Sequence, residues 1–107
     1  MSQSYPEQRT VPRYMFAATV DIVEPATEMH FSGRVSEISR KGCYVDILNT
    51  LPRETPVQLR VLRDKGTFVT DGKVIYVQEG VGMGVGFIDV PPNQLEILDS
   101  WLDELKG

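Results

Sequence analysis

The sequence contains one cysteine, one histidine and no long apolar run. Cys43 alone cannot form a disulfide within the chain, and Cys43 with His30 supplies too few nitrogen and sulfur ligands for a zinc site. No segment approaches the roughly 20 consecutive apolar residues that a membrane helix needs. The first residues also lack the basic and apolar segments of a secretory signal. These absences predict a cytoplasmic protein with no metal, no disulfide and no membrane insertion.

An excess of positive charge is also missing. The chain has 11 Lys and Arg against 15 Asp and Glu, a formal net charge of −4. Five acidic residues and one basic residue lie within 89–107, so the first 88 residues are electrically balanced. Nucleic-acid-binding domains usually carry a basic excess, so DNA is not an expected partner. A small anionic ligand needs only a local basic cluster, which this composition allows.

What is present fits one small globular domain. The length is 107 residues, with 41% hydrophobic and 24% charged residues, which leaves room for a single core. Residues 1–13 are largely polar with two prolines, and we expect them to form a flexible arm. Residues 14–107 are then the folded domain.

Apolar residues recur with a period of two in most of this domain. That pattern predicts half-buried strands, separated by turns rich in glycine and proline. The expected strands are residues 14–22, 29–35, 43–48, 57–61, 67–78 and 83–88. Gly72 suggests a bulge or bend in the fifth strand, and Gly42 suits a positive φ in the turn before the third. Six short strands with regular turns predict a mainly β fold, a six-stranded antiparallel barrel.

The end of the chain has a helical period instead. Leucines at 95, 98, 102 and 105 form one stripe, which Ile97 and Trp101 widen. We expect a C-terminal α-helix over about 93–105, with Asn93 as its N-cap after two prolines. Such a helix is marginal alone, so its stripe must pack on the barrel or on a partner, and a homodimer through this stripe is one alternative. Trp101 is expected to pack between helix and barrel.

Two short motifs carry the functional signal. The first is Arg9-Thr10-Val11-Pro12-Arg13, directly before the first strand, and the second is Glu37-Ile38-Ser39-Arg40-Lys41-Gly42, in the turn after the second strand. Together with Gly84-Val85-Gly86-Phe87, they resemble the PilZ domain family, whose pattern is Arg-x-x-x-Arg followed by Asp or Asn-x-Ser-x-x-Gly. The resemblance runs from about Glu7 to the C-terminal helix, and it implies a six-stranded PilZ-type barrel.

The family consists of bacterial cytoplasmic receptors for cyclic di-GMP, a ligand with two phosphates and two guanines. The resemblance therefore implies this nucleotide as ligand, with no further cofactor. Arg9 and Arg13 would bind phosphate and guanine, which suits the planar arginine fork. The arm would become ordered over the ligand, and a partner protein in motility, adhesion or exopolysaccharide control would respond to the change.

The second motif would complete the nucleotide site by the same resemblance. Glu37 would accept hydrogen bonds from guanine N1 and N2, Ser39 would bond phosphate or base, and Gly42 would let the backbone approach the ligand. Arg40 and Lys41 are not motif positions, but they would add positive charge as secondary ligand contacts.

Glu37 departs from the family pattern, which has Asp or Asn there. Its carboxylate is one methylene further from the backbone, so the base contact could survive with a shifted base or weaken. Loss of one good base contact costs about 1–3 kcal/mol, roughly a factor of 5–150 in affinity. Glu37 thus leaves open an alternative, a degenerate PilZ-type adaptor that binds protein partners without nucleotide.

A barrel that binds single-stranded nucleic acid is a weaker alternative, because Phe16 and Phe31 are in phase with apolar residues and the charge is balanced. The alternating glycines at 80, 82, 84 and 86 do not match G-x-G-x-x-G, so they indicate relief of crowding in a curved strand. An enzyme is not expected, because no candidate nucleophile has an evident base.

Overall fold

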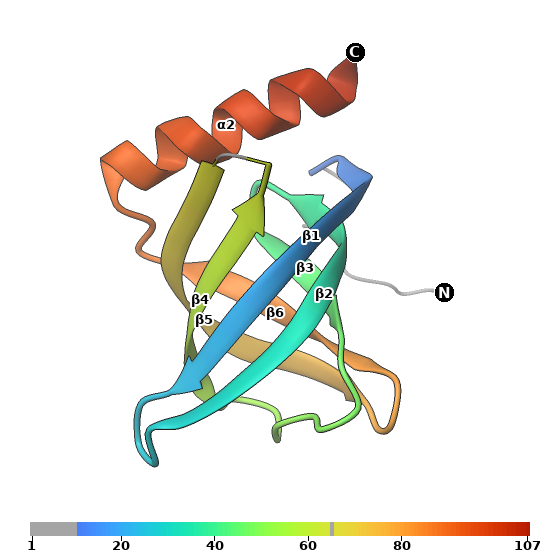
Figure 1. Ribbon diagram of the computed structural model, residues 1–107, viewed down its shortest axis with the longest axis vertical. Coiled ribbons are helices and arrows are strands. Elements are labelled where there is room, and N and C mark those ends of the chain that lie inside the picture. The colour runs from blue at the N-terminus through green and yellow to red at the C-terminus, as the bar shows by residue number, and fades with distance from the viewer. Residues whose placement is uncertain (1–10, 65) are drawn as a thin grey trace.

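The computed structural model describes residues 11–64 and 66–107. In these residues six antiparallel strands close into a barrel in the order β1-β2-β3-β6-β5-β4, with one helix across an end (Figure 1). The elements are β1 (Arg13–Glu24), β2 (Met29–Ser39), β3 (Gly42–Asp46), β4 (Pro56–Arg63), β5 (Gly66–Gln78), β6 (Gly82–Ile88) and α2 (Pro92–Lys106). The mainly β fold class, the six-stranded barrel and the C-terminal helix are confirmed.

The barrel core follows the period of two that the sequence shows. In β1 the side chains of Phe16, Ala18, Val20 and Ile22 are buried while their neighbours in the strand are not. The other strands contribute Val35, Ile38, Cys43, Val45, Val57, Leu59, Val61, Phe68, Val74, Met83 and Val85. Full burial of such an aliphatic or aromatic side chain contributes about 1.5–3 kcal/mol. This alternation is why each strand has a defined inner and outer face.

In two strands, β2 and β5, the alternation of buried and exposed side chains is interrupted at positions that the sequence pattern did not predict. β2 shifts register between Val35 and Glu37, and β5 shifts between Val74 and Tyr76. Of the bulge or bend expected at Gly72, the bulge is wrong, because Gly72 pairs in regular register with Phe87. A Cβ on Gly72 would lie 2.8 Å from the carbonyl oxygen of Gly86, so this glycine allows close strand packing. The shift in β2 also explains why the strand end was predicted too early. The period of two is broken after Val35, but the strand itself continues to Ser39.

Helix α2 begins one residue earlier than expected, and its cap differs. Pro91 is the N-cap, without a side-chain hydrogen bond, so the assignment of Asn93 as N-cap is wrong. Pro92 occupies the first turn, where its fixed φ favours a helix and its missing N–H costs no bond. The carbonyl oxygen of Pro91 accepts from the backbone N–H groups of Gln94 and Leu95 at 2.9 and 2.8 Å, which begins the helix.

The apolar stripe of α2 packs on the barrel. Leu98, Trp101 and Leu102 are buried, and the Trp101 ring lies 5.5 Å from the Phe16 ring. The expected role of Trp101 in packing helix against barrel is thus confirmed. The rest of the stripe, Leu95, Ile97 and Leu105, is partly buried against the same core. Arg63 from β4 adds an ion pair to Glu104 of α2 at 2.8 Å.

Cys43 is a core residue rather than a reactive one. Burial raises the pKa of its thiol to about 12, so the nucleophilic thiolate is scarce at neutral pH. In the described part of the chain, no group of three His, Cys, Asp or Glu side chains could hold a metal ion. None of the described helices is long and apolar enough to cross a membrane.

Candidate functional site

A pocket of about 330 Å³ lies on the outer wall of the barrel. It extends across the neighbouring strands β2, β3, β6 and β5 and includes the beginning of β1. Its volume is within the range of small-molecule sites. Among the residues that line it are five predicted from the sequence, Arg13, Glu37, Ser39, Lys41 and Gly42.

The alternating glycines of β6 explain why the wall is hollowed there. Gly84 pairs with Tyr44 on one side and with Tyr76 on the other, so the three residues share the outer face. A Cβ on Gly84 would lie 2.3 Å from Cε1 of Tyr76, and a Cβ on Gly82 would lie 2.7 Å from the Tyr44 hydroxyl. The expectation that these two glycines relieve crowding is confirmed. The crowding comes from the two tyrosine side chains and, at Gly82, also from the Val45 carbonyl oxygen at 2.4 Å.

The register shifts in β2 and β5 turn functional side chains toward this wall. A β-bulge inserts one residue and moves the following side chains to the opposite face. After the shift in β2, Glu37 pairs with the outward-facing Tyr44, and the next residue, Ile38, enters the core. The shift in β5 likewise pairs Tyr76 with Gly84.

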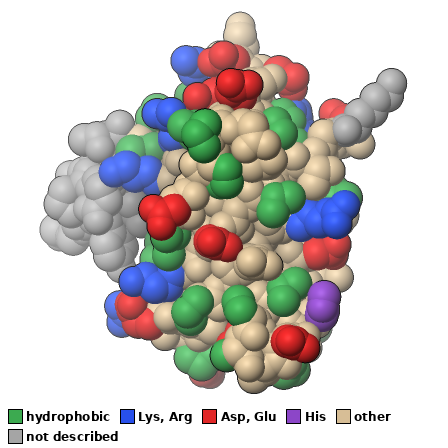
Figure 2. Space-filling model, turned by 90° about the vertical axis from the view of Figure 1, so that its left-hand side faces the viewer, with side chains coloured by type: hydrophobic (Ala, Val, Ile, Leu, Met, Phe, Trp, Pro, Cys, Tyr) green, Lys and Arg blue, Asp and Glu red, His purple; other side chains and the backbone are tan. Residues whose placement is uncertain are grey.

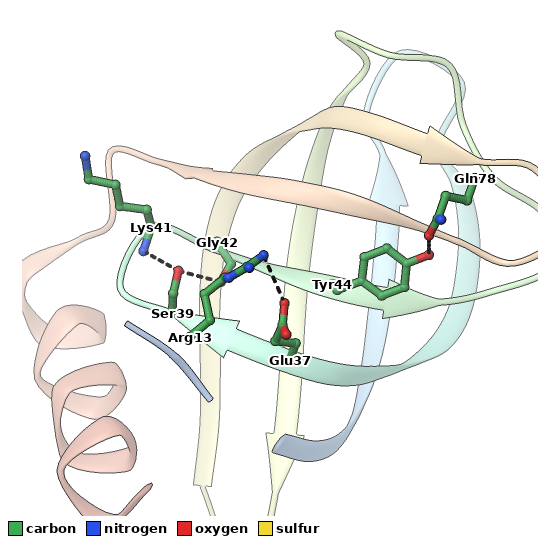
Figure 3. Close-up of polar contacts among 7 residues, drawn as sticks. All are labelled: Arg13, Glu37, Ser39, Lys41, Gly42, Tyr44 and Gln78. Atoms are coloured by element: carbon green, nitrogen blue, oxygen red, sulfur yellow. Dashed lines mark hydrogen bonds and ion pairs between the residues drawn. The ribbon is translucent and has the colours of Figure 1, made fainter. Parts of the chain in front are cut away.

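Arg13 and Glu37 form an ion pair at the edge of the pocket (Figure 3). Arg13 Nη1 lies 3.4 Å from Glu37 Oε1, and the two side chains are 48% and 40% exposed. The structure thus brings together one residue from each sequence motif. Arg13, which the sequence analysis places at the end of the arm, is the first residue of β1. Arg9 lies outside the described residues.

The turn between β2 and β3 is closed by the motif serine (Figure 3). Ser39 Oγ accepts from the backbone N–H of Lys41 at 3.1 Å and donates to the carbonyl oxygen of Gly42 at 3.4 Å. The carbonyl oxygen of Lys41 accepts from the backbone N–H of Phe87 at 2.8 Å, which joins the turn to β6. Ser39 is buried, and its two hydrogen bonds fix the backbone shape of the turn that carries Lys41.

Gly42 is required for a reason other than the expected positive φ. The positive-φ glycines of the described residues are Gly80 and Gly107, so that expectation is wrong. A Cβ on Gly42 would lie 2.4 Å from the carbonyl oxygen of Val85. Glycine is needed because β3 and β6 pack closely where the turn enters the barrel.

We expect Gly42→Ala to destabilise the fold, because the new methyl group would force the backbone of β3 and β6 apart. Overpacking of this kind costs about 1–3 kcal/mol, measurable by urea denaturation. Gly86→Ala is the matched control, since Gly86 pairs with Gly42 and a Cβ there would first meet the Ile75 side chain at 3.3 Å. Equal stability of the two variants would refute this role of Gly42.

Arg40 is not among the residues that line the pocket. Its guanidinium Nε lies 2.9 Å from Asp99 Oδ1 of α2. The predicted secondary contact of Arg40 with ligand is therefore not supported by its position, whereas Lys41, its neighbour, lines the pocket. Arg40 instead connects the turn at 39–42 to the C-terminal helix.

The sequence did not indicate a ligand role for the other charged residues and the tyrosines that line the pocket: Tyr44, Arg53, Glu54, Lys73 and Tyr76. They come from β3, β5 and the loop before β4, and only the closed barrel brings these segments together. The alternating glycines of β6 were the available signal, because they leave one face of this strand without side chains, and side chains of the adjoining strands must cover that face.

The pocket is basic in a chain that is acidic overall. Four cationic side chains line it (Arg13, Lys41, Arg53 and Lys73) against two carboxylates (Glu37 and Glu54), a net formal charge of +2 where the whole chain carries −4. On the face of the molecule in Figure 2, acidic and basic side chains are interspersed. Local enrichment of positive charge favours an anionic ligand.

Tyr44 lines the pocket on the side away from Arg13 (Figure 3), and two contacts hold its ring in place. Its hydroxyl donates to Oε1 of Gln78, and its ring lies 6.0 Å from the Tyr76 ring (Figure 3). Burial, and secondarily the nearby negative charge of Asp46, raises the pKa of Tyr44 above its ordinary value. The phenol stays neutral at physiological pH, so it offers an aromatic face and a hydrogen-bonding group without adding negative charge.

The family profile described as PilZ domain matches residues 7–104. The chain belongs to the PilZ domain family. Its match covers both sequence motifs and every strand of the barrel, as the resemblance implied. A comparison with curated proteins found no match.

Solved structures, two of them of named PilZ domains, have the same fold as this PilZ domain. The PilZ domain of YcgR from Escherichia coli with c-di-GMP superimposes with a TM-score of 0.77 at 16% identity, covering 92% of each chain. The PilZ domain of CeSA from a cellulose-synthesizing bacterium gives 0.69 at 19% identity, covering 90% of this chain and 99% of that one. MotI/DgrA, an inhibitor of motility from Bacillus subtilis, gives 0.72 at 16% identity, covering 88% of this chain and 48% of that one.

Proposed function

We propose that this PilZ domain is a bacterial cytoplasmic receptor that binds cyclic di-GMP in the pocket on its outer wall. The observation that carries the proposal is the meeting of Arg13, Glu37, Ser39, Lys41 and Gly42 at one pocket with a net formal charge of +2. Membership of the family and the likeness in fold to a YcgR domain with c-di-GMP support the choice of ligand.

In this proposal the cations and the carboxylate of the pocket have separate roles. The Arg13 guanidinium, with Arg9 of the arm, binds phosphate and guanine, and Lys41 adds a point charge. The Glu37 carboxylate accepts from the N1 and N2 donors of guanine, which an adenine base does not offer in the same pattern. Ser39 and Gly42 shape the turn over which the ligand lies.

The ion pair between Arg13 and Glu37 does not prevent binding. An exposed pair of this kind contributes only about 0.2–1 kcal/mol. A hydrogen bond between charged partners contributes about 1.5–3 kcal/mol, and an arginine can make two with one phosphate. The ligand therefore outcompetes the Glu37 carboxylate for Arg13, and it leaves that carboxylate free to accept from the base.

Binding would reach a protein partner through the ordered arm and through α2. The turn at 39–42 is tied to α2 by the contact between Arg40 and Asp99 at 2.9 Å. A shift of this turn over the ligand would strain or break that contact and alter the exposed face of the helix. A partner in motility, adhesion or exopolysaccharide control would detect the altered surface.

A calorimetric titration of the purified protein with cyclic di-GMP tests the proposal, with GMP and cyclic di-AMP as controls. We expect selective binding at micromolar concentration or below, and the stoichiometry distinguishes one bound ligand from a stacked pair. If high concentrations of cyclic di-GMP produce neither heat nor a thermal shift, the receptor proposal is wrong. The alternative is then the degenerate PilZ-type adaptor, which binds protein partners without nucleotide. In that case Arg13 stays in its ion pair with Glu37.

A further inference from the structure

A second ion pair lines the same pocket and belongs to neither sequence motif. Lys73 Nζ of β5 lies 3.0 Å from Glu54 Oε1, and the side chains are 42% and 65% exposed. Both residues line the pocket together with Arg53. The pocket therefore contains two similar ion pairs, and each consists of one cation and one partly solvent-exposed carboxylate.

Strand register places Lys73 within reach of the motif turn. Lys73 pairs with Gly86 of β6, and Gly86 pairs with Gly42 of β3. The Cα atoms of Lys73 and Gly42 are thus two strand spacings apart, about 10 Å, with a glycine between them. Gly86 contributes no side chain to this space, and the side chain nearest to it is Ile75 of β5, 3.3 Å from a Cβ built on Gly86. On the other side of the turn, Arg13 pairs with Ser39, so the two cations flank the turn at 39–42.

The loop that carries Glu54 is fixed to β5 and holds this residue in an unusual conformation. The backbone N–H of Glu54 donates to the carbonyl oxygen of Val74 at 2.7 Å, and the N–H of Val74 donates to the carbonyl oxygen of Thr55 at 3.0 Å. Glu54 has φ +75°, in the left-handed region that side chains other than glycine disfavour. These hydrogen bonds hold the Glu54 backbone in a conformation that costs conformational energy, and this conformation places the Glu54 carboxylate beside Lys73.

We propose that Lys73 binds the second phosphate of the dinucleotide and that the Glu54 carboxylate occupies that phosphate position in the free protein. The inference rests on the proposed function and extends it, because the pocket then has two anion subsites, one at Arg13 and one at Lys73. A lysine ammonium suits the second subsite, since it binds phosphate as a point charge. On binding, the phosphate displaces Glu54, and Arg53 adds positive charge beside it.

The test compares binding of cyclic di-GMP by the wild-type protein and by Lys73→Met, Glu54→Gln and the double variant. We expect Lys73→Met to weaken binding at least about 10-fold, with Lys73→Arg restoring most of it. Glu54→Gln removes the competing carboxylate and is expected to tighten binding about 2- to 5-fold. That gain should vanish in the double variant, because Glu54 acts only through Lys73. A merely structural pair would show no such coupling.

Matched controls come from a similar pair outside the pocket. Lys106 Nζ lies 3.7 Å from Asp103 Oδ1 on α2, with both side chains exposed. Lys106→Met and Asp103→Asn make the same changes in charge and should leave affinity unchanged, and thermal unfolding of every variant verifies folding. If wild-type binds and Arg13→Ala does not, but Lys73→Met and Glu54→Gln bind like wild-type, the second subsite is refuted and the proposed function stands. If wild-type does not bind, both fail.

Discussion

Replacement of Arg13 by alanine is expected to abolish binding of cyclic di-GMP, with a loss of at least about 100-fold in affinity. The guanidinium can form two charged hydrogen bonds with one phosphate, and alanine provides none. The ion pair with Glu37 at 3.4 Å is exposed, so its loss should lower the free energy of unfolding by less than about 1 kcal/mol. Calorimetry measures the affinity and thermal unfolding measures the stability.

The matched control for Arg13→Ala is Arg60→Ala. Arg60 is an exposed arginine of β4 and is not among the residues that line the pocket. It should change neither affinity nor stability. If Arg13→Ala unfolds the protein, the beginning of β1 has a structural role and its assignment to the ligand is wrong. Arg9→Ala is expected to weaken binding as well, on the strength of the sequence motif alone.

Truncation of Trp101 to alanine is expected to have the largest effect on stability. The side chain is 6% exposed, and its ring lies 5.5 Å from Phe16 and 6.2 Å from Phe68. A Cβ on Gly66 would lie 3.2 Å from Trp101 Cζ2, so the indole also packs against the beginning of β5. Loss of a buried aromatic side chain costs about 3–5 kcal/mol, which urea denaturation measures directly.

Trp101→Phe separates packing volume from the indole itself. Phenylalanine retains an aromatic ring against Phe16 and Phe68, so this variant should lose clearly less stability than the alanine variant. Because Trp101 does not line the pocket, the fraction of either variant that remains folded should bind nucleotide. A cost below about 1 kcal/mol for Trp101→Ala would mean that α2 is only loosely attached to the barrel, contrary to its buried stripe.

The elements of the fold could be predicted because each has its own local period. β1 alternates from Phe16 to Ile22, and α2 repeats its leucines at intervals of three and four, so burial of one face was evident in both. Element ends were less predictable. β3 ends at Asp46 rather than at Leu48, because its partner strand β6 begins at Gly82, the residue that pairs with Asp46. Leu48 lies beyond this last pair and is 78% exposed.

The residues of the candidate site that the sequence indicated are those of the two family motifs, Arg13, Glu37, Ser39 and Gly42. Lys41 is not a motif position and was named because it adds positive charge beside them. Tyr76 was not predictable, because a residue inserted near Ile75 decides which face of β5 it occupies. Lys73 and Glu54 were missed for a related reason, since their proximity depends on a loop that bonds to β5 far along the chain.

The fold class and the helix follow from the sequence alone, because hydrophobic period is a local property of a chain. The motif residues were indicated by the resemblance of two short segments to the PilZ domain family. Only the tertiary structure shows why residue 42 must be glycine, that Arg40 contacts Asp99, and that a second ion pair, Lys73 with Glu54, lines the pocket. Each depends on which strand lies beside which and in what register. Register is set by the closure of the whole barrel and by its bulges, and no local segment contains that information.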